Sequence, residues 1–197
     1  MDQFVLGLGV ACWGVVLVVW IVVAARHAGT RPAGRVRGST DIRSTVLAML
    51  AVTALVLIGR NPSLLAPLTV SSPLVTAIGA GVLVGSTLFA VWARLALGRS
   101  WSVDPQAAPD VGLHTDGPYA VTRHPIYTGL LGMMLGTTLM GGLGQWITLV
   151  IAGLVVAGIK IRAEERLLLA TFPDAYTDYR KRVPALIPRW RMPLAGR

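Results

Sequence analysis

The chain contains several uncharged, mostly apolar runs that are about as long as a lipid bilayer is thick. A helix rises 1.5 Å per residue, so about 20 apolar residues cross a hydrocarbon core of roughly 30 Å. Residues 4–25 and 73–93 are uncharged throughout, and residues 44–59 form a shorter run. Only 14% of the residues are charged and 54% are hydrophobic, which excludes an ordinary soluble domain. The chain is therefore expected to be an integral membrane protein.

The longest uncharged stretch, residues 125–159, is too long for a single span. It contains Gly141, Gly142 and Gly144 within four residues, and clustered glycines interrupt a helix because they allow positive φ and lower helix stability. The stretch is therefore predicted to be a tight hairpin of two helices. With the three earlier runs, this predicts an all-α protein with five membrane-spanning helices.

Basic residues are distributed unequally over the predicted loops. Arg60 is alone in the second loop, whereas the other 17 of the 18 Lys and Arg residues lie in the first loop, the third loop and the C-terminal tail. The positive-inside rule then places the N-terminus outside and the C-terminus in the cytoplasm of a cell-membrane protein. Orientation and contact with anionic lipid headgroups explain the net charge of +9, so we expect no nucleic-acid partner.

Small residues recur four positions apart within two of the predicted spans. The pairs are Gly81 with Gly85 and Gly132 with Gly136. Such spacing lets neighbouring helix backbones approach closely in a membrane. Both pairs are therefore expected to lie at helix contacts.

Several common kinds of functional site are not expected in this chain. A single cysteine, Cys12, excludes a disulfide framework, and three scattered histidines argue against a metal site of cysteine and histidine ligands. No serine or cysteine nucleophile is accompanied by an evident histidine and acid, and no phosphate-binding loop is present. Covalent hydrolysis is therefore not supported.

The third loop, which leads into the fourth predicted span, contains one candidate site. Gly117 and Pro118 form a turn signal, and Pro125 suits the first turn of a helix. This places Arg123 and His124 at a helix N-terminus with Tyr127 one turn inside, an arrangement that favours an anionic ligand such as a carboxylate. The alternative is that Arg123 and the tyrosines only anchor the chain to lipid headgroups.

The tail begins with a second polar cluster. Glu164 and Glu165 are the only glutamates and lie at the expected membrane boundary, where a carboxylate is costly unless it is paired or functional. Helical spacing allows Glu164 to pair with Lys160 and Glu165 with Arg162, so a structural ion-pair cluster is an alternative to a site. Residues 172–188 then predict a short amphipathic helix and a proline-broken segment, on the bilayer surface or over the helix ends.

Three ordered blocks at matching spacing resemble the isoprenylcysteine carboxyl methyltransferase family of membrane enzymes. The pattern G-x-Y-x-x-x-R-H-P-x-Y-x-G is met by Gly117, Tyr119, Arg123, His124, Pro125, Tyr127 and Gly129. E-E-x-x-L is met by Glu164, Glu165 and Leu168, and Y-x-x-Y-x-K/R-x-V-P by Tyr176, Tyr179, Lys181, Val183 and Pro184. The resemblance divides the chain into a three-span scaffold, residues 1–93, and a catalytic region, residues 94–197.

This resemblance implies S-adenosylmethionine held between the last two spans and the folded tail. Carried over by position, the cofactor contacts are Val111, Gly112, Leu113, His114, Tyr119, Arg123, His124, Pro125, Ile126, Tyr127 and Glu164. Lys160, Arg162 and Glu165 are then expected to serve the methyl acceptor, although either glutamate fits the cofactor role. Methyl transfer to an anionic acceptor needs no acid or base, so positioning and exclusion of water carry most of the catalysis.

One departure from the family pattern leaves the acceptor open. Members that act on prenylcysteine have an arginine four residues before the first glutamate, where this chain has Lys160. Lysine keeps the charge but lacks the bidentate fork that recognises a carboxylate. Prenylcysteine is therefore one candidate among lipophilic carboxylates, thiols and amines. The alternatives to a methyltransferase are an NADPH-dependent enzyme similar to sterol reductases and a non-enzymatic lipid-binding scaffold.

Overall fold

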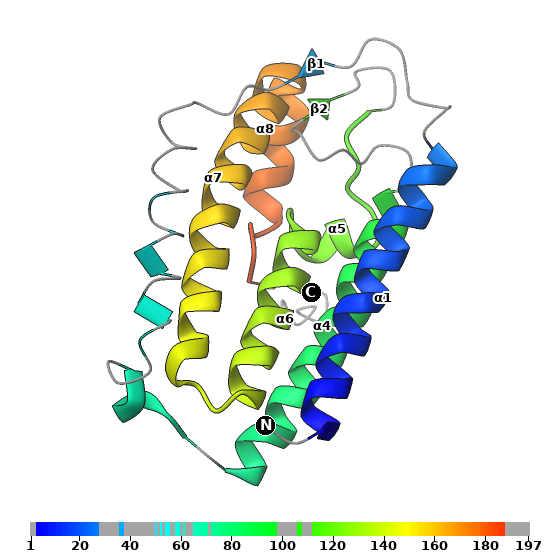
Figure 1. Ribbon diagram of the computed structural model, residues 1–197. Helices are drawn as coiled ribbons and strands as arrows, with labels where there is room; N and C mark the ends of the chain where they lie inside the picture. Colours follow the sequence, from blue (N-terminus) through cyan, green and yellow to red (C-terminus); the bar gives the residue numbers. More distant parts are fainter. Residues whose placement is uncertain are drawn as a thin grey trace, which may run out of the picture.

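Nearly all of the described chain is helical. The computed structural model describes residues 3–27, 36–37, 65–70, 72–97, 106–107 and 112–187, and the single positions 50, 52, 54, 55, 58, 59 and 61. Four long helices lie side by side in Figure 1: α1 (Gln3–His27), α4 (Pro73–Leu97), α6 (Pro125–Met140) and α7 (Ile147–Thr171). Short elements lie at their ends: η1 (Ala66–Leu68), α5 (Pro118–Val121), η3 (Gly144–Trp146) and α8 (Pro173–Arg182).

A small antiparallel pair departs from the all-α prediction. Strand β1 (Val36–Arg37) pairs with β2 (Gln106–Ala107), with Val36 opposite Ala107 and Arg37 opposite Gln106. Two-residue strands carry no alternating pattern of apolar residues, so sequence periodicity does not reveal them.

Three of the described helices are long and apolar enough to cross a membrane. They are Gln3–Arg26, Pro73–Leu97 and Gly144–Thr171, and α6 is a shorter apolar helix of 16 residues. The chain is thus a multi-pass membrane protein. Most of the predicted second span, residues 44–59, lies outside the described residues. The number of five spans and their orientation therefore stay predictions.

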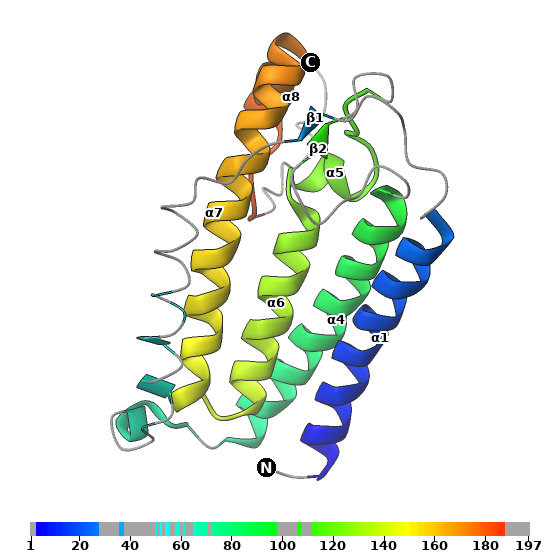
Figure 2. The same ribbon diagram turned by 45° about the horizontal axis from the view of Figure 1, so that its top comes forward.

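The helix directions bring several ends together at one side of the bundle. In Figures 1 and 2, α1 and α4 run in the same direction, α6 runs back, and α7 returns. The last residues of α1, α4 and α7 and the first residues of α6 therefore lie at the end that carries α5 and α8. We call this end the α8 end.

The turn between α6 and α7 confirms the predicted helical hairpin. Helix α6 ends at Met140, and the three residues 142–144 all adopt positive φ: 82° for Gly142, 59° for Leu143 and 50° for Gly144. Leucine rarely adopts this conformation, whereas glycine does so freely. The Val70 N–H donates to the Gly142 carbonyl at 2.9 Å, so the segment before α4 contacts this turn.

Glycines on α6 allow it to pack closely against α4. A Cβ atom at Gly136 would lie 2.6 Å from the Leu83 backbone nitrogen, and one at Gly132 would clash with the Ser86 side chain. The packing predicted for Gly132 and Gly136 is confirmed. For Gly81 and Gly85 it is wrong within the described residues, because a Cβ at either position meets no atom within 4 Å.

Gly136→Ala is expected to destabilise the protein by about 1–3 kcal/mol, because the added methyl group meets backbone atoms of α4 that cannot move aside cheaply. Gly81→Ala is the matched control on α4. It should leave stability unchanged or raise it slightly, since alanine is the better helix former and the site is open. Thermal unfolding in detergent measures both, and equal melting temperatures would contradict the described α4–α6 packing.

Candidate active site

The loop before α6 is shaped by a glycine and two prolines. Gly117 adopts φ 59°, Pro118 begins the single turn of α5, and Thr122 is extended. His124 is the N-cap residue of α6 and Pro125 occupies the first turn, as the sequence predicts. His124 is therefore fixed at the point where α6 begins.

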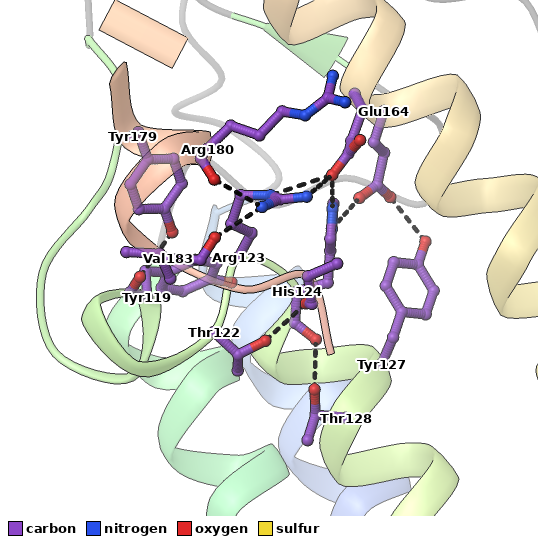
Figure 3. Close-up of polar contacts among 12 residues, drawn as sticks. Tyr119, Thr122, Arg123, His124, Tyr127, Thr128, Glu164, Tyr179, Arg180 and Val183 are labelled. Atoms are coloured by element: carbon purple, nitrogen blue, oxygen red, sulfur yellow. Dashed lines mark hydrogen bonds and ion pairs between the residues drawn. The ribbon is translucent and has the colours of Figure 1, made fainter. Parts of the chain in front are cut away.

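The His124 ring contacts both glutamates of α7, and Figure 3 shows it beside Glu164. Its Nδ1 is 3.4 Å from Glu164 Oε2 and its Nε2 is 3.2 Å from Glu165 Oε1. Burial alone would lower the pKa of His124, but hydrogen bonds to Glu164 and Glu165 and their negative charges outweigh it, so the pKa is raised. The geometry and charge of this site favour the imidazolium.

Tyr127 completes the contacts of Glu164. Its hydroxyl donates to Glu164 Oε1 at 2.6 Å, so His124 and Tyr127 bond different oxygens of one carboxylate. The Glu164 side chain is 27% exposed and that of Glu165 18%. Glu164 is thus the more accessible of the two carboxylates.

Arg123 uses all of its guanidinium nitrogens within the protein. Nε and Nη2 donate to Glu165 Oε1 at 3.1 and 2.6 Å. Nη1 donates to the carbonyls of Val183 at 2.6 Å and Arg180 at 3.3 Å. The Arg123 side chain is only 9% exposed. It therefore joins α7 to the chain that follows α8.

Residues 183–186, which we call the returning segment, run along the start of α6. The N–H groups of Arg123 and His124 donate to the carbonyls of Pro184 and Ala185 at 2.8 and 3.1 Å. The hydroxyls of Thr122 and Thr128 donate to Ala185 and Leu186 at 2.6 and 2.8 Å. The expectation that the N–H groups at the start of α6 are open to an anion is thus wrong for Arg123 and His124, because main-chain carbonyls occupy them.

The pairs expected within α7 do not form in the described part of the chain. Lys160 is partly buried and Arg162 is exposed, and neither makes an ion pair with a described glutamate. Helical spacing permits those pairs, but Glu164 and Glu165 both turn toward α6 and bond there. The structure thus brings Glu165 to Arg123 and His124, and leaves Arg162 apart from them.

The segment before α5 contributes His114, whose ring lies edge-on against Tyr119 with centroids 5.1 Å apart. Its Nε2 atom is buried and has no hydrogen-bond partner among the described residues. Gly112 is exposed and Leu113 partly buried, while Val111 lies outside the described residues. Within the described part of the chain, this segment therefore presents a ring nitrogen without a partner beside Tyr119.

Tyr119 links this segment to the rest of the cluster. Burial and then the negative charge of Glu164 raise its pKa, so the two side chains lie within electrostatic reach. Pro125 is buried and Ile126 partly buried in the first turn of α6. Most of the predicted cofactor residues thus lie around the ends of α6 and α7.

Three supporting residues were not predicted as site residues. Tyr179 on α8 donates from its hydroxyl to the Tyr119 carbonyl at 2.6 Å, and Thr122 and Thr128 hold the returning segment. The i, i+3 spacing of Tyr176 and Tyr179 places both on one helix face and could have indicated Tyr179. The two threonines donate to main-chain carbonyls, and because every residue has such a carbonyl, the sequence does not indicate these contacts.

Comparison with known proteins places the chain in a family. A family model described as "Phospholipid methyltransferase" matches residues 74–175, slightly more than half of the chain. Protein-S-isoprenylcysteine O-methyltransferase of Schizosaccharomyces pombe is 38% identical over 49% of this chain and 42% of its own length. The cobalt-zinc-cadmium resistance protein CzcN of Cupriavidus metallidurans is 36% identical over 39% of this chain and 36% of its own length. The matches thus span less than half of either relative.

The fold agrees with these matches. The solved structure of the eukaryotic intramembrane Ras methyltransferase ICMT, an isoprenylcysteine carboxyl methyltransferase, aligns with a TM-score of 0.56 and 21% identity, over 92% of this chain and 67% of that one. The resemblance of the motif blocks to that family is therefore confirmed by both sequence and fold. The chain belongs to the phospholipid methyltransferase family.

Proposed function

We propose that this chain is an integral membrane enzyme that transfers a methyl group from S-adenosylmethionine to a lipophilic acceptor. The observation that carries the proposal is the hydrogen-bonded cluster of His124, Tyr127 and Glu164 at the α8 end, in a chain of a methyltransferase family. Such a site would meet a soluble cofactor on one side and a membrane-embedded acceptor on the other.

The residues present fit this cofactor by their chemistry. Glu164 can accept hydrogen bonds from an amine or a ribose hydroxyl, and the buried Nε2 of His114 has no partner among the described residues. Tyr119 and the first turn of α6, from His124 to Tyr127, would line the same site. When bound, S-adenosylmethionine supplies an electrophilic methyl group on a sulfonium. The protein's part is to hold, orient and shield it.

Lys160 is the residue we assign to the acceptor, with Arg162 as its neighbour. It lies four residues before Glu164, about one helical turn nearer the membrane and on the same face of α7. A charge at that level would orient an anionic headgroup while the lipophilic part stays in the bilayer. Lipophilic carboxylates, including a prenylcysteine-like compound, as well as thiols and amines remain the candidate acceptors.

The cofactor class is tested by ligand binding to the purified protein. Calorimetric titration should detect S-adenosylhomocysteine, and methyl transfer from radiolabelled S-adenosylmethionine should reach at least one of a lipophilic carboxylate, thiol or amine. Binding of NADPH instead would assign a reductase. Binding of neither would favour a lipid-binding scaffold and refute the proposal.

We also propose five spans, with the α8 end in the cytoplasm, a scaffold at residues 1–93 and a catalytic region at residues 94–197. The parallel directions of α1 and α4 support this topology, because the last residues of α1 and the short helix η1 lie at opposite ends of the bundle. The 17-to-1 distribution of basic residues supports the orientation.

A reporter fused after Arg197 is therefore expected to be cytoplasmic, and one inserted near Pro67 to be outside. Enzymatic reporters that work on only one side of the membrane measure both positions. The reverse pattern would place the cofactor site outside the cell, away from S-adenosylmethionine, and would contradict the topology and the proposed function together.

A further inference from the structure

We propose that Glu165 is a positioning residue, which fixes His124 and touches neither cofactor nor acceptor, while Glu164 is the carboxylate that meets the cofactor. The inference rests on the proposed function in naming S-adenosylmethionine as the cofactor. It assigns different roles to two adjacent glutamates that sequence alone cannot tell apart.

The contacts of the two carboxylates differ in kind. One oxygen of Glu165, Oε1, accepts from two nitrogens of Arg123 and lies 3.2 Å from His124 Nε2. Glu164 instead makes one contact per oxygen, at 2.6 Å to Tyr127 and 3.4 Å to His124. A carboxylate has about four lone-pair positions, so both glutamates keep acceptor capacity, and exposure separates them, because the Glu164 side chain is the more accessible of the two.

The His124 ring can satisfy both carboxylates only as the imidazolium. An ionised carboxylate accepts and does not donate, so each ring nitrogen needs a proton to bond its glutamate. The charges then balance, with Arg123 and His124 against Glu164 and Glu165. Replacing the Glu165 carboxylate by a neutral group would weaken the hydrogen bond of the Nε2–H and would favour the neutral ring, which is held less firmly.

The other titratable groups around His124 do not replace Glu165. Tyr127 on α6 and Tyr119 on α5 lie on the Glu164 side, and Tyr176 on α8 lies near Arg123 and Glu165. Burial raises the pKa of Tyr119 and of Tyr176, so both stay neutral near pH 7. Arg123, which shares Glu165 Oε1 with the ring, is positive, so it cannot stabilise the imidazolium.

The experiment compares E165Q with E164Q in the full-length protein. Carbon-13-labelled histidine reports the titration of His124 by NMR, since the chain has only His27 and His114 besides, and S-adenosylhomocysteine affinity is measured at each pH. E165Q should move the His124 midpoint to lower pH and weaken binding about tenfold near pH 7.5, with recovery once the ring is protonated again. E164Q also removes a charge beside the ring and should lower the His124 midpoint, but it should weaken binding at every pH, because a direct contact is lost.

Two further variants control for folding. E165D keeps the charge and should preserve a higher His124 midpoint than E165Q, with affinity within about threefold of wild type. D178N breaks an exposed pair with Lys181 on α8 and should change neither readout.

A pH-independent loss of binding in E165Q with an unmoved His124 midpoint would make Glu165 a direct ligand, and unchanged binding and titration would make it dispensable. Either result overturns the assignment. If the wild type binds no S-adenosylhomocysteine, the proposed function fails, whereas the His124 titration still tests whether Glu165 positions the ring.

Discussion

Glu164→Gln is expected to raise the dissociation constant for S-adenosylhomocysteine tenfold or more. One charge-assisted hydrogen bond in a water-poor site is worth roughly 1.5–3 kcal/mol. Tyr127→Phe removes the 2.6 Å hydrogen bond that orients the carboxylate, so a smaller loss of affinity is expected there. Calorimetric titration of the purified variants measures both.

Arg162→Ala provides the contrast on the same helix. Arg162 is exposed and makes no ion pair with a described glutamate, so cofactor affinity should stay nearly constant while turnover with an anionic lipophilic acceptor falls. The assignment of Glu164 is wrong if Glu164→Gln lowers the melting temperature and leaves affinity per folded molecule untouched. In that case the cluster only stabilises the fold.

Arg123→Ala is expected to cost about 3–5 kcal/mol of stability and to release the returning segment. The Arg123 side chain is 9% exposed and bonds Glu165 together with two main-chain carbonyls, so its loss leaves Glu165 with His124 alone among the partners described above and leaves both carbonyls without this donor. Thermal unfolding measures the first effect. Trypsin measures the second, because Arg180, Lys181 and Arg182 lie next to that segment.

Asp178→Asn is the matched control for this variant. Its pair with Lys181 joins side chains that are 68% and 69% exposed, and such surface pairs contribute little to stability. If the Arg123→Ala and Asp178→Asn variants have the same melting temperature and are cleaved by trypsin at the same rate, the contacts of Arg123 do not hold the returning segment.

The helix boundaries of the second half could be predicted because they depend on local chemistry. Pro125 fits the first turn of α6, and the glycines at 141, 142 and 144 interrupt the apolar stretch where the turn to α7 lies. Which glycines pack could not be predicted in the same way. Gly81 and Gly136 both belong to pairs of glycines spaced four residues apart, so the sequence does not distinguish them. Whether a glycine lies at a helix contact depends on which face of its helix the neighbouring helix covers.

The sequence predicts which residues form the candidate site better than it predicts which of them bond to one another. Local spacing pairs Glu164 with Lys160 and Glu165 with Arg162, yet the observed partners are Tyr127, His124 and Arg123, about forty residues away. Long-range partners depend on how helices are placed, which a single sequence does not record. Main-chain carbonyls at 184 and 185 are equally invisible, since every residue has one.

The returning segment also has a consequence for how the protein is made. Val183 and Pro184, which bond Arg123, are synthesised about sixty residues after it, a delay of roughly 3–12 s at about 5–20 residues per second. During this interval the nascent chain carries α6 and then α7 to the membrane while the N–H groups at the start of α6 still face water or headgroups. Biogenesis therefore passes through a stage in which α6 and α7 have been synthesised but the returning segment does not yet bond Arg123.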